Sequence, residues 1–148
     1  MSIIKHDFEK MNITKIKQTK NRQKLTVITA YDALFSNLFS KSADMILVGD
    51  ILNMSFMGKS DTLSATLDQM IYHTKAVCNG AKDAFVITDM PFATYINKDE
   101  ALKNCARVYQ ETLASAVKIE GGEDKADIIK HLTSNAIAVM GHIGLMPQ

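Results

Sequence analysis

Residues 45–50 read MILVGD, an apolar run that ends abruptly on Gly49 and Asp50. Four other apolar runs end in a similar way on small or polar residues. They are residues 25–30 (before Tyr31-Asp32), 85–88 (before Asp89), 116–119 (before Glu120-Gly121-Gly122) and 137–140 (before Gly141-His142). Continuous runs rich in Val, Ile and Leu are typical of strands buried on both faces of a parallel sheet. An enzyme built on such a sheet carries its reactive side chains at the carboxyl ends of the strands.

Helical patterns separate the five runs, and this alternation predicts an α/β fold with parallel strands. Asp32 is placed to cap a first helix whose apolar face holds Leu34, Phe35, Leu38 and Phe39. Longer helices are predicted over residues 67–79, 99–115 and 124–134. Their predicted inward-facing residues are Met70, Ile71, Thr74, Val77 and Cys78, then Leu102, Cys105, Ala106, Tyr109 and Leu113, and finally Ala126, Ile128, Ile129 and Leu132. Residues 53–66, rich in Ser, Gly and Asp, are predicted to form a loop over an active site.

The alternation fits either a doubly wound sheet or a (β/α)8 barrel. No G-x-G-x-x-G follows the first run, which weakens the dinucleotide-binding version of the doubly wound sheet. Acidic residues at the ends of several strands favour the barrel, in which one ring of strand ends converges on one site. A complete barrel has eight strands and this sequence predicts five. The expected fold is therefore an incomplete (β/α)8 barrel over residues 25–148, with about five βα units.

The chain has 148 residues, a formal net charge of +1 and 47% hydrophobic residues, which suit one globular domain. Residues 1–24 form a basic N-terminal arm, predicted to be a solvated amphipathic helix rather than a phosphate or membrane contact. Cys78 and Cys105 lack metal-ligand spacing and are expected in the core. No signal peptide or long apolar run is visible, so we expect a cytoplasmic protein with no membrane and no nucleic-acid partner.

Three acidic residues, Asp50, Asp89 and Glu120, each lie one or two residues past the apolar run of their own strand. In a barrel the three carboxylates would crowd together, and like charges at close range need neutralisation. Carboxylates and water are the ligands that suit Mg²⁺. The sequence therefore favours a Mg²⁺ site, against the alternative that each acid only caps the following helix or a turn.

Two basic side chains accompany these acids. Lys118 lies two residues before Glu120 and points to the same side of its strand, where it could hold an anionic substrate or stabilise an enolate. The alternative is an ion pair with Glu120 that only fills space. His142 is a candidate for substrate contact or proton transfer, or else a structural histidine. His6, His73 and His131 have no comparable context. The residues together predict Mg²⁺-assisted chemistry next to the carbonyl of an α-keto acid.

At these same residues the sequence resembles the ketopantoate hydroxymethyltransferase family. The resembling segments are residues 28–32 (ITAYD), 45–50 (MILVGD), 61–63 (DTL), 71–76 (IYHTKA), 88–92 (TDMPF), 117–122 (VKIEGG) and 141–148 (GHIGLMPQ). They follow the order of the family and extend from about residue 12 to the end of the chain. The resemblance implies a (β/α)8 barrel, usually assembled into a decamer, with an N-terminal helix packed against the barrel.

The resemblance also implies an activity in pantothenate biosynthesis. A hydroxymethyl group would pass from 5,10-methylenetetrahydrofolate to 3-methyl-2-oxobutanoate, giving 2-dehydropantoate. Matching the motifs implies that the Mg²⁺ site and the keto-acid site have Asp50 and Asp89 in common. The implied Mg²⁺ positions are Asp50, Asp89 and Glu120, and the implied keto-acid positions are Asp50, Ile51, Asp89, Lys118 and His142.

The sequence departs from the family pattern at two positions, Ile51 and Met146. The family normally has Ser where Ile51 stands, so a hydroxyl that contacts the substrate carboxylate is missing, and Met146 replaces a usual Thr. The family's general base is expected beyond Gln148, which leaves no catalytic residue assigned here. Two other interpretations stay open: a truncated non-catalytic fragment, and a Mg²⁺-dependent lyase or mutase acting on α-keto acids.

Overall fold

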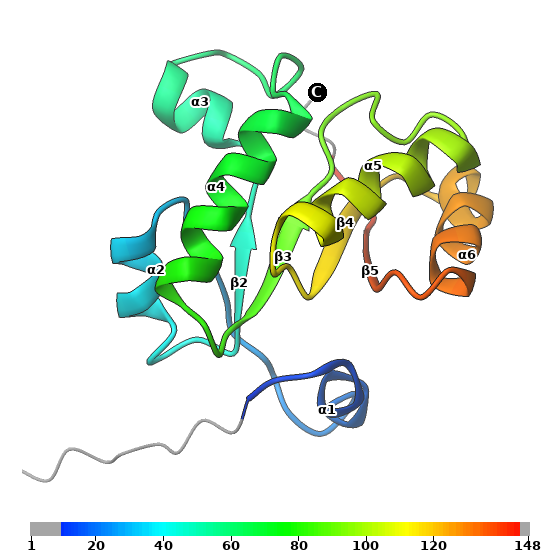
Figure 1. Ribbon diagram of the computed structural model, residues 1–148. Helices are drawn as coiled ribbons and strands as arrows, with labels where there is room; N and C mark the ends of the chain where they lie inside the picture. Colours follow the sequence, from blue (N-terminus) through cyan, green and yellow to red (C-terminus); the bar gives the residue numbers. More distant parts are fainter. Residues whose placement is uncertain (1–9, 146–148) are drawn as a thin grey trace, which may run out of the picture.

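The computed structural model describes residues 10–145, and its centre is a sheet of five parallel strands (Figure 1). The strands are β1 (Val27–Thr29), β2 (Met45–Val48), β3 (Phe85–Asp89), β4 (Ala116–Glu120) and β5 (Val139–His142). They lie side by side in the order β1-β2-β3-β4-β5, which is also their order in the chain. The predicted α/β fold with parallel strands is confirmed. The first strand is shorter than expected, and the fifth begins two residues later and includes His142.

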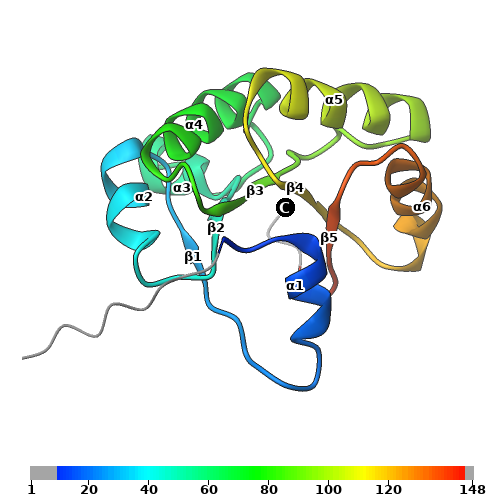
Figure 2. The ribbon, with the colours of Figure 1, turned by 60° about the horizontal axis from the view of Figure 1, so that its bottom comes forward.

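The helices lie on two sides of this sheet. They are α1 (Ile13–Gln18), α2 (Ala33–Phe39), α3 (Leu52–Met57), α4 (Leu67–Gly80), α5 (Lys98–Glu111) and α6 (Ala126–Ser134), with a 3₁₀ turn η1 (Glu123–Lys125) before α6. Figure 2 shows a curved sheet with α2, α4, α5 and α6 along its outer side, while α1 lies on the inner side. The curvature gives the sheet a concave face, which holds α1 and the polar residues described below.

The two faces of the sheet have separate cores. On the outer face, Ile46, Val48 and Val86 pack with Met70 and Val77 of α4. The part of the core beneath α5 and α6 contains Val117, Ile119, Cys105, Val108 and Leu132. On the inner face, a smaller core combines Met45, Phe85, Ile87 and Ala116 with Met11 and Ile16 from the N-terminal segment. Met11 and Ile16 therefore cover the amino ends of the strands on the concave face.

Local capping explains where the longer helices begin. Thr66 forms a capping box with Gln69 at the start of α4. The Asn97 side chain accepts a hydrogen bond from the backbone N–H of Glu100 at the start of α5. The predicted cap at α2 is confirmed, since the Asp32 carboxylate accepts from the backbone N–H of Phe35 at 2.8 Å. Each cap satisfies a backbone donor that the first turn of a helix leaves unpaired.

The prediction of a continuous loop over residues 53–66 is wrong, because α3 occupies its first part. Leu52 is fully buried in the core with Ile46 and Met70, which anchors this short helix to the sheet. Gly58 ends α3 in the left-handed conformation, with φ of 63°. A buried residue at the start and a glycine at the end thus define a short helix in the segment that was predicted to be a loop.

Of the predicted apolar face of α2, only Phe39 packs against the core, where it is partly buried. Leu34 is 77% exposed, and Phe35 and Leu38 are also exposed. The residue that α2 buries is Ser36, whose hydroxyl donates to the carbonyl of Val77 on α4 at 3.0 Å. Small side chains at this contact allow α2 and α4 to approach closely.

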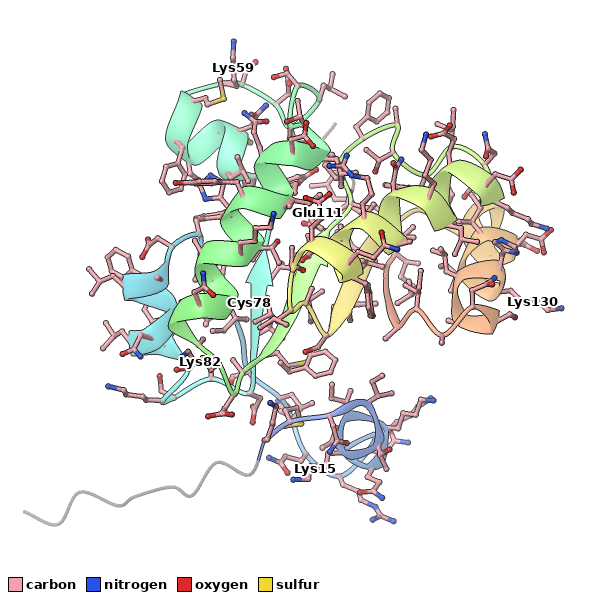
Figure 3. All side chains as sticks on the ribbon, viewed as in Figure 1. Lys15, Lys59, Cys78, Lys82, Glu111 and Lys130 are labelled. Atoms are coloured by element: carbon pink, nitrogen blue, oxygen red, sulfur yellow. The ribbon has the colours of Figure 1, made fainter. Side chains whose placement is uncertain are left out.

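Two inward positions at helix ends are also wrong. Leu113 is 75% exposed because α5 ends at Glu111 and the backbone at Thr112 is already extended. Ala126 is exposed because the predicted helix 124–134 begins with the 3₁₀ turn η1. The core assignments of Cys78 and Cys105 are confirmed, and burial raises the pKa of Cys105 to about 12. Figure 3 labels Cys78 on α4.

The described part of the basic arm, residues 10–24, is only partly helical. Within it, α1 is six residues long and Asn12 caps its first turn. Lys5, His6, Asp7 and Glu9 lie outside the described residues, as does Met146 at the other end. The division of the chain at residue 24 stays a prediction. Between residues 10 and 145, no helix combines the length and the apolarity needed to cross a membrane.

Candidate functional site

Four ionisable side chains are buried together at the carboxyl ends of β2, β3 and β4. Asp50, Asp89, Lys118 and Glu120 are all between 4% and 8% exposed. Asp89 and Lys118 are register partners on neighbouring strands. Glu120 and His142 are register partners in the same way on β4 and β5. Side chains of partner residues lie on the same face of a sheet, so the strand pairing itself brings these groups together.

Lys118 is the central cation of this group. Its Nζ donates to the carboxylate of Asp89 and, at 3.0 Å, to Oε1 of Glu120. Burial alone would lower the pKa of Lys118, but the two carboxylates outweigh it and raise that pKa, so the ammonium stays charged. The ion pair with Glu120 is therefore formed, and it is extended by a second one with Asp89.

Glu120 also orients His142. Its Oε1 lies 2.7 Å from Nδ1 of His142. A carboxylate at this distance favours the tautomer with a proton on Nδ1, which leaves Nε2 as an acceptor for a ligand. The His142 side chain is 39% exposed, so the ring joins the buried ion pairs to the surface.

Asp50 lies on the other side of Asp89. Its backbone N–H donates to Oδ2 of Asp89 at 3.4 Å. Burial, together with the negative charges of Asp89 and Glu120, raises the pKa of Asp50 to about 6. Burial also raises the pKa of Asp89, against the opposing effect of Lys118. The site thus holds more buried acid than a single lysine can neutralise.

The donor set fits a divalent cation bound by few protein ligands. Three carboxylates and one ammonium leave an excess of negative charge when all the acids are ionised. Among residues 10–145, however, no three His, Cys, Asp or Glu side chains converge closely enough to hold an ion by themselves. Glu120 is already bonded to Lys118 and His142. Asp50 and Asp89 therefore fit a Mg²⁺ site in which water and substrate oxygens supply the remaining ligands.

Ile51 lies beside the same strand end. It precedes α3 and is 44% exposed. If Gly49 carried a Cβ, that atom would lie 3.5 Å from Cγ2 of Ile51. The structure thus places Ile51 with Asp50, Asp89, Lys118 and His142 at one edge of the sheet. No side-chain hydroxyl is available at position 51.

The sequence reasoning missed two residues, Tyr31 and His73. A Cβ added to Gly49 would lie 3.8 Å from the Tyr31 hydroxyl and 3.6 Å from Oδ2 of Asp89, so these two groups flank the same space. Nδ1 of His73 lies 2.8 Å from the carbonyl oxygen of Tyr31. Tyr31 could have been found, because it follows the first apolar run as the acids follow theirs. His73 could not, since its partner lies 42 residues away in the chain.

The sequence model of the ketopantoate hydroxymethyltransferase family matches residues 10–148. The chain belongs to this family. A protein named 3-methyl-2-oxobutanoate hydroxymethyltransferase from Aliarcobacter butzleri (strain RM4018) is 82% identical over 148 residues, which are all of this chain and 55% of that protein. Proteins of the same name are 67% identical in Sulfurimonas denitrificans and 54% identical in Helicobacter pylori (strain ATCC 700392 / 26695), covering 95% and 100% of the chain and 53% and 55% of each relative.

The chain therefore spans about half the length of the curated members of the ketopantoate hydroxymethyltransferase family that it matches. Two solved structures share its fold at low sequence identity. They are 2,3-dimethylmalate lyase, a PEP mutase/isocitrate lyase superfamily member (TM-score 0.62, 18% identity), and oxaloacetate acetylhydrolase in complex with oxalate (TM-score 0.63, 14% identity). Each match covers 88% of this chain and 52% of the chain in the matched structure.

Proposed function

We propose that this chain forms the metal and keto-acid half of a 3-methyl-2-oxobutanoate hydroxymethyltransferase. The whole protein would transfer a hydroxymethyl group from 5,10-methylenetetrahydrofolate to 3-methyl-2-oxobutanoate, giving 2-dehydropantoate for pantothenate biosynthesis. One observation carries the proposal: Asp89, Lys118, Glu120 and His142 form a continuous chain of contacts beside Asp50. Membership of the family supplies the reaction to which this arrangement corresponds.

The fold supports the same proposal. Five parallel strands in chain order, with a curved sheet and helices on its convex side, are what the first part of a (β/α)8 barrel would contain (Figure 2). The resemblance implies a barrel for this family, and the chain covers about half the length of the members that it matches, which together support an incomplete barrel. In a barrel, the carboxyl ends of the strands surround the active site. The ion-pair cluster, which consists of Asp50, Asp89, Lys118, Glu120 and His142, lies at that end.

Each residue has a role in the proposed chemistry. Asp50 and Asp89 would hold Mg²⁺ directly, and Glu120, the third predicted metal residue, would reach the ion through a bridging water. The bound ion would supply positive charge to the carboxylate and keto oxygens of the substrate. Lys118 has three N–H groups and uses two on Asp89 and Glu120, so we assign the third to the keto acid. His142 would contact the substrate through Nε2, held in place by Glu120.

Ile51 would contact the keto acid through its backbone and its methyl groups. Proton removal from C3 is assigned to a base beyond Gln148, as the resemblance implies. We also assign 5,10-methylenetetrahydrofolate as co-substrate, a homo-oligomer as the assembled state, and the cytoplasm as the location. Exposed Leu34, Phe35 and Leu38 on α2 are in keeping with an assembly of several chains.

Isothermal titration calorimetry with Mg²⁺ and 3-methyl-2-oxobutanoate tests the half-site. We expect the full chain to bind the keto acid only with Mg²⁺ present, and Asp89→Asn to weaken Mg²⁺ binding at least about tenfold. Asp127→Asn is the matched control, because Asp127 is exposed on α6 and pairs only with Lys98 at the surface. Equal Mg²⁺ affinity in Asp89→Asn and the parent would refute the metal assignment.

Two further measurements separate binding from catalysis. Ile51→Ser restores a hydroxyl at this strand end and should tighten keto-acid binding, whereas no change would mean that the substrate does not reach position 51. Exchange of the C3 hydrogen of the keto acid for deuterium, followed by NMR with Mg²⁺ and no folate, tests proton removal. We expect little exchange with residues 1–148 alone. Rapid exchange would show that a base lies within these residues.

A further inference from the structure

Tyr31 lies near the ion-pair cluster but comes from the end of β1, whereas the cluster itself is formed at the ends of β2, β3, β4 and β5. The residue lies two positions after the end of β1. If Gly49 carried a Cβ, that atom would lie within 4 Å of both the Tyr31 hydroxyl and Oδ2 of Asp89. Adding a side chain at Gly49 would therefore bring atoms between the phenol and the carboxylate. The absence of a Cβ at this position keeps the space over the strand end open.

The ring of Tyr31 is held in place by aromatic neighbours. Phe56 on α3 packs edge-on against it, with ring centroids 5.2 Å apart and planes at 84°. His73 on α4 packs against both rings, at 6.2 Å from Tyr31 and 5.5 Å from Phe56. Nδ1 of His73 also lies 2.8 Å from the Tyr31 carbonyl oxygen. The phenol is thus fixed from two helices and is not a loose surface side chain.

The Tyr31 hydroxyl is chemically a donor at neutral pH. Burial raises its pKa, the negative charges of Asp89 and Asp50 raise it further, and both effects outweigh the hydrogen bond with Ser55. The hydroxyl therefore keeps its proton beside two acids. The hydrogen bond from Ser55 lowers the Tyr31 pKa, so the Ser55 hydroxyl donates to the phenol oxygen. The Tyr31 proton is then available for a ligand.

An anionic ligand at this strand end needs such donors. The cluster contains three carboxylates, and two N–H groups of its only ammonium are already bonded to Asp89 and Glu120. No hydroxyl stands at position 51. We propose that the Tyr31 hydroxyl, oriented by Ser55, donates a hydrogen bond to an anionic oxygen of the bound keto acid. This inference rests on the proposed function, because it concerns the ligand of the same site.

Calorimetry on Tyr31→Phe tests the inference, since this change removes the hydroxyl and keeps the ring. Binding of 3-methyl-2-oxobutanoate in the presence of saturating Mg²⁺ should weaken about tenfold, the loss expected for one hydrogen bond to a charged group. Binding of Mg²⁺ without the keto acid should stay unchanged. Ser55→Ala, at an exposed position of α3, should weaken keto-acid binding by a smaller factor, about threefold.

Tyr72→Phe is the matched control, because it makes the same chemical change on an exposed ring that packs on His73 from another side at 5.3 Å. It should bind the keto acid as the parent does. Keto-acid affinity of Tyr31→Phe within twofold of the parent would overturn the inference. An equal loss of Mg²⁺ affinity would also overturn it, since the hydroxyl would then act on Asp50 and Asp89. A parent chain that binds no keto acid with Mg²⁺ would refute the proposed function itself, a result distinct from a parent and a variant that bind equally.

Discussion

Asp89 and Lys118 are register partners on β3 and β4, and their side chains form an ion pair in which both are almost completely buried. Glu120 and His142 repeat the relationship on β4 and β5, with 2.7 Å between Oε1 and Nδ1. The contacts of the site are therefore set by strand pairing. A slip of one residue in either pairing would turn one partner to the other face of the sheet.

Replacement of Lys118 by Met should destabilise the fold strongly. The change keeps the length of the side chain but leaves Asp89 and Glu120 buried without their shared cation. We expect the free energy of unfolding at pH 7.5 to fall by about 3–5 kcal/mol, measured by urea denaturation. The loss should shrink as the pH falls, because burial already raises the pKa of Asp89 and its protonation removes one of the two unpaired charges.

The control for this experiment is Lys75→Met, which breaks an exposed ion pair with Glu111 between α4 and α5. Figure 3 labels Glu111 at the surface between these helices. An exposed pair contributes at most about 1 kcal/mol. A loss in Lys118→Met no larger than that in Lys75→Met would mean that the buried cation is dispensable.

Replacement of Asp50 by Asn should stabilise the metal-free protein above pH 6. Folding raises the pKa of Asp50 from its ordinary 3.8 to about 6, so the folded protein binds this proton more tightly than the unfolded chain. The contribution of Asp50 to stability is therefore greatest below pH 4 and is lost as the pH rises from 4 to 6. The asparagine variant lacks this loss. Its advantage should grow to about 3 kcal/mol at pH 8, and equal stability of the two proteins at pH 8 would contradict the raised pKa.

Mg²⁺ binding should depend on pH through the same carboxyl group. Below pH 6 a bound ion must displace the proton of Asp50, so the apparent affinity should fall about tenfold for each pH unit. Between pH 7 and 8 the affinity should change little. Calorimetry in Mg²⁺ at several pH values measures both regimes, with Asp127→Asn as a control that keeps the same profile. An affinity that is constant from pH 8 to pH 5 would exclude Asp50 as a ligand.

A pair of buried hydroxyls fixes α4 to β3 away from the site. Oγ1 of Thr74 lies 3.0 Å from Oγ1 of Thr88, and both residues are fully buried. Thr74→Val should cost about 1–3 kcal/mol in unfolding free energy, because it leaves the hydroxyl of Thr88 without its partner. The double change Thr74→Val with Thr88→Val should cost less than the sum of the single changes. Additive losses in urea denaturation would show that the two hydroxyls do not interact.

Much of the fold follows from simple sequence patterns. The run at residues 45–50 and its ending on Asp50 predict a buried strand and the position of an acid at its carboxyl end, and the structure contains both. Parallel pairing then brings the ends of neighbouring strands together. The sequence therefore identifies which residues gather at the site, although their roles in binding stay proposals.

Other features depend on contacts that no local pattern records. The helix α3 forms in a polar segment because Leu52 is buried under distant parts of the chain. The spacing of Leu34 and Leu38 predicts one apolar face but does not specify what covers it, and both are exposed in this chain. The bonding of Glu120 to both Lys118 and His142 depends on the register of β4 and β5, which the sequence leaves open within a residue or two.

The spatial order of the strands repeats their order in the chain, so each strand pairs with the one that leaves the ribosome just before it. The sheet can grow during synthesis without any strand waiting for a later partner. The groups of the site come together in the same order, with Asp50 and Asp89 on adjoining strand ends before Lys118 has been made. If β2 and β3 pair before β4 is made, the two neighbouring acids lie together at that stage without their cation. A proton retained by one of them relieves their repulsion until β4 is added.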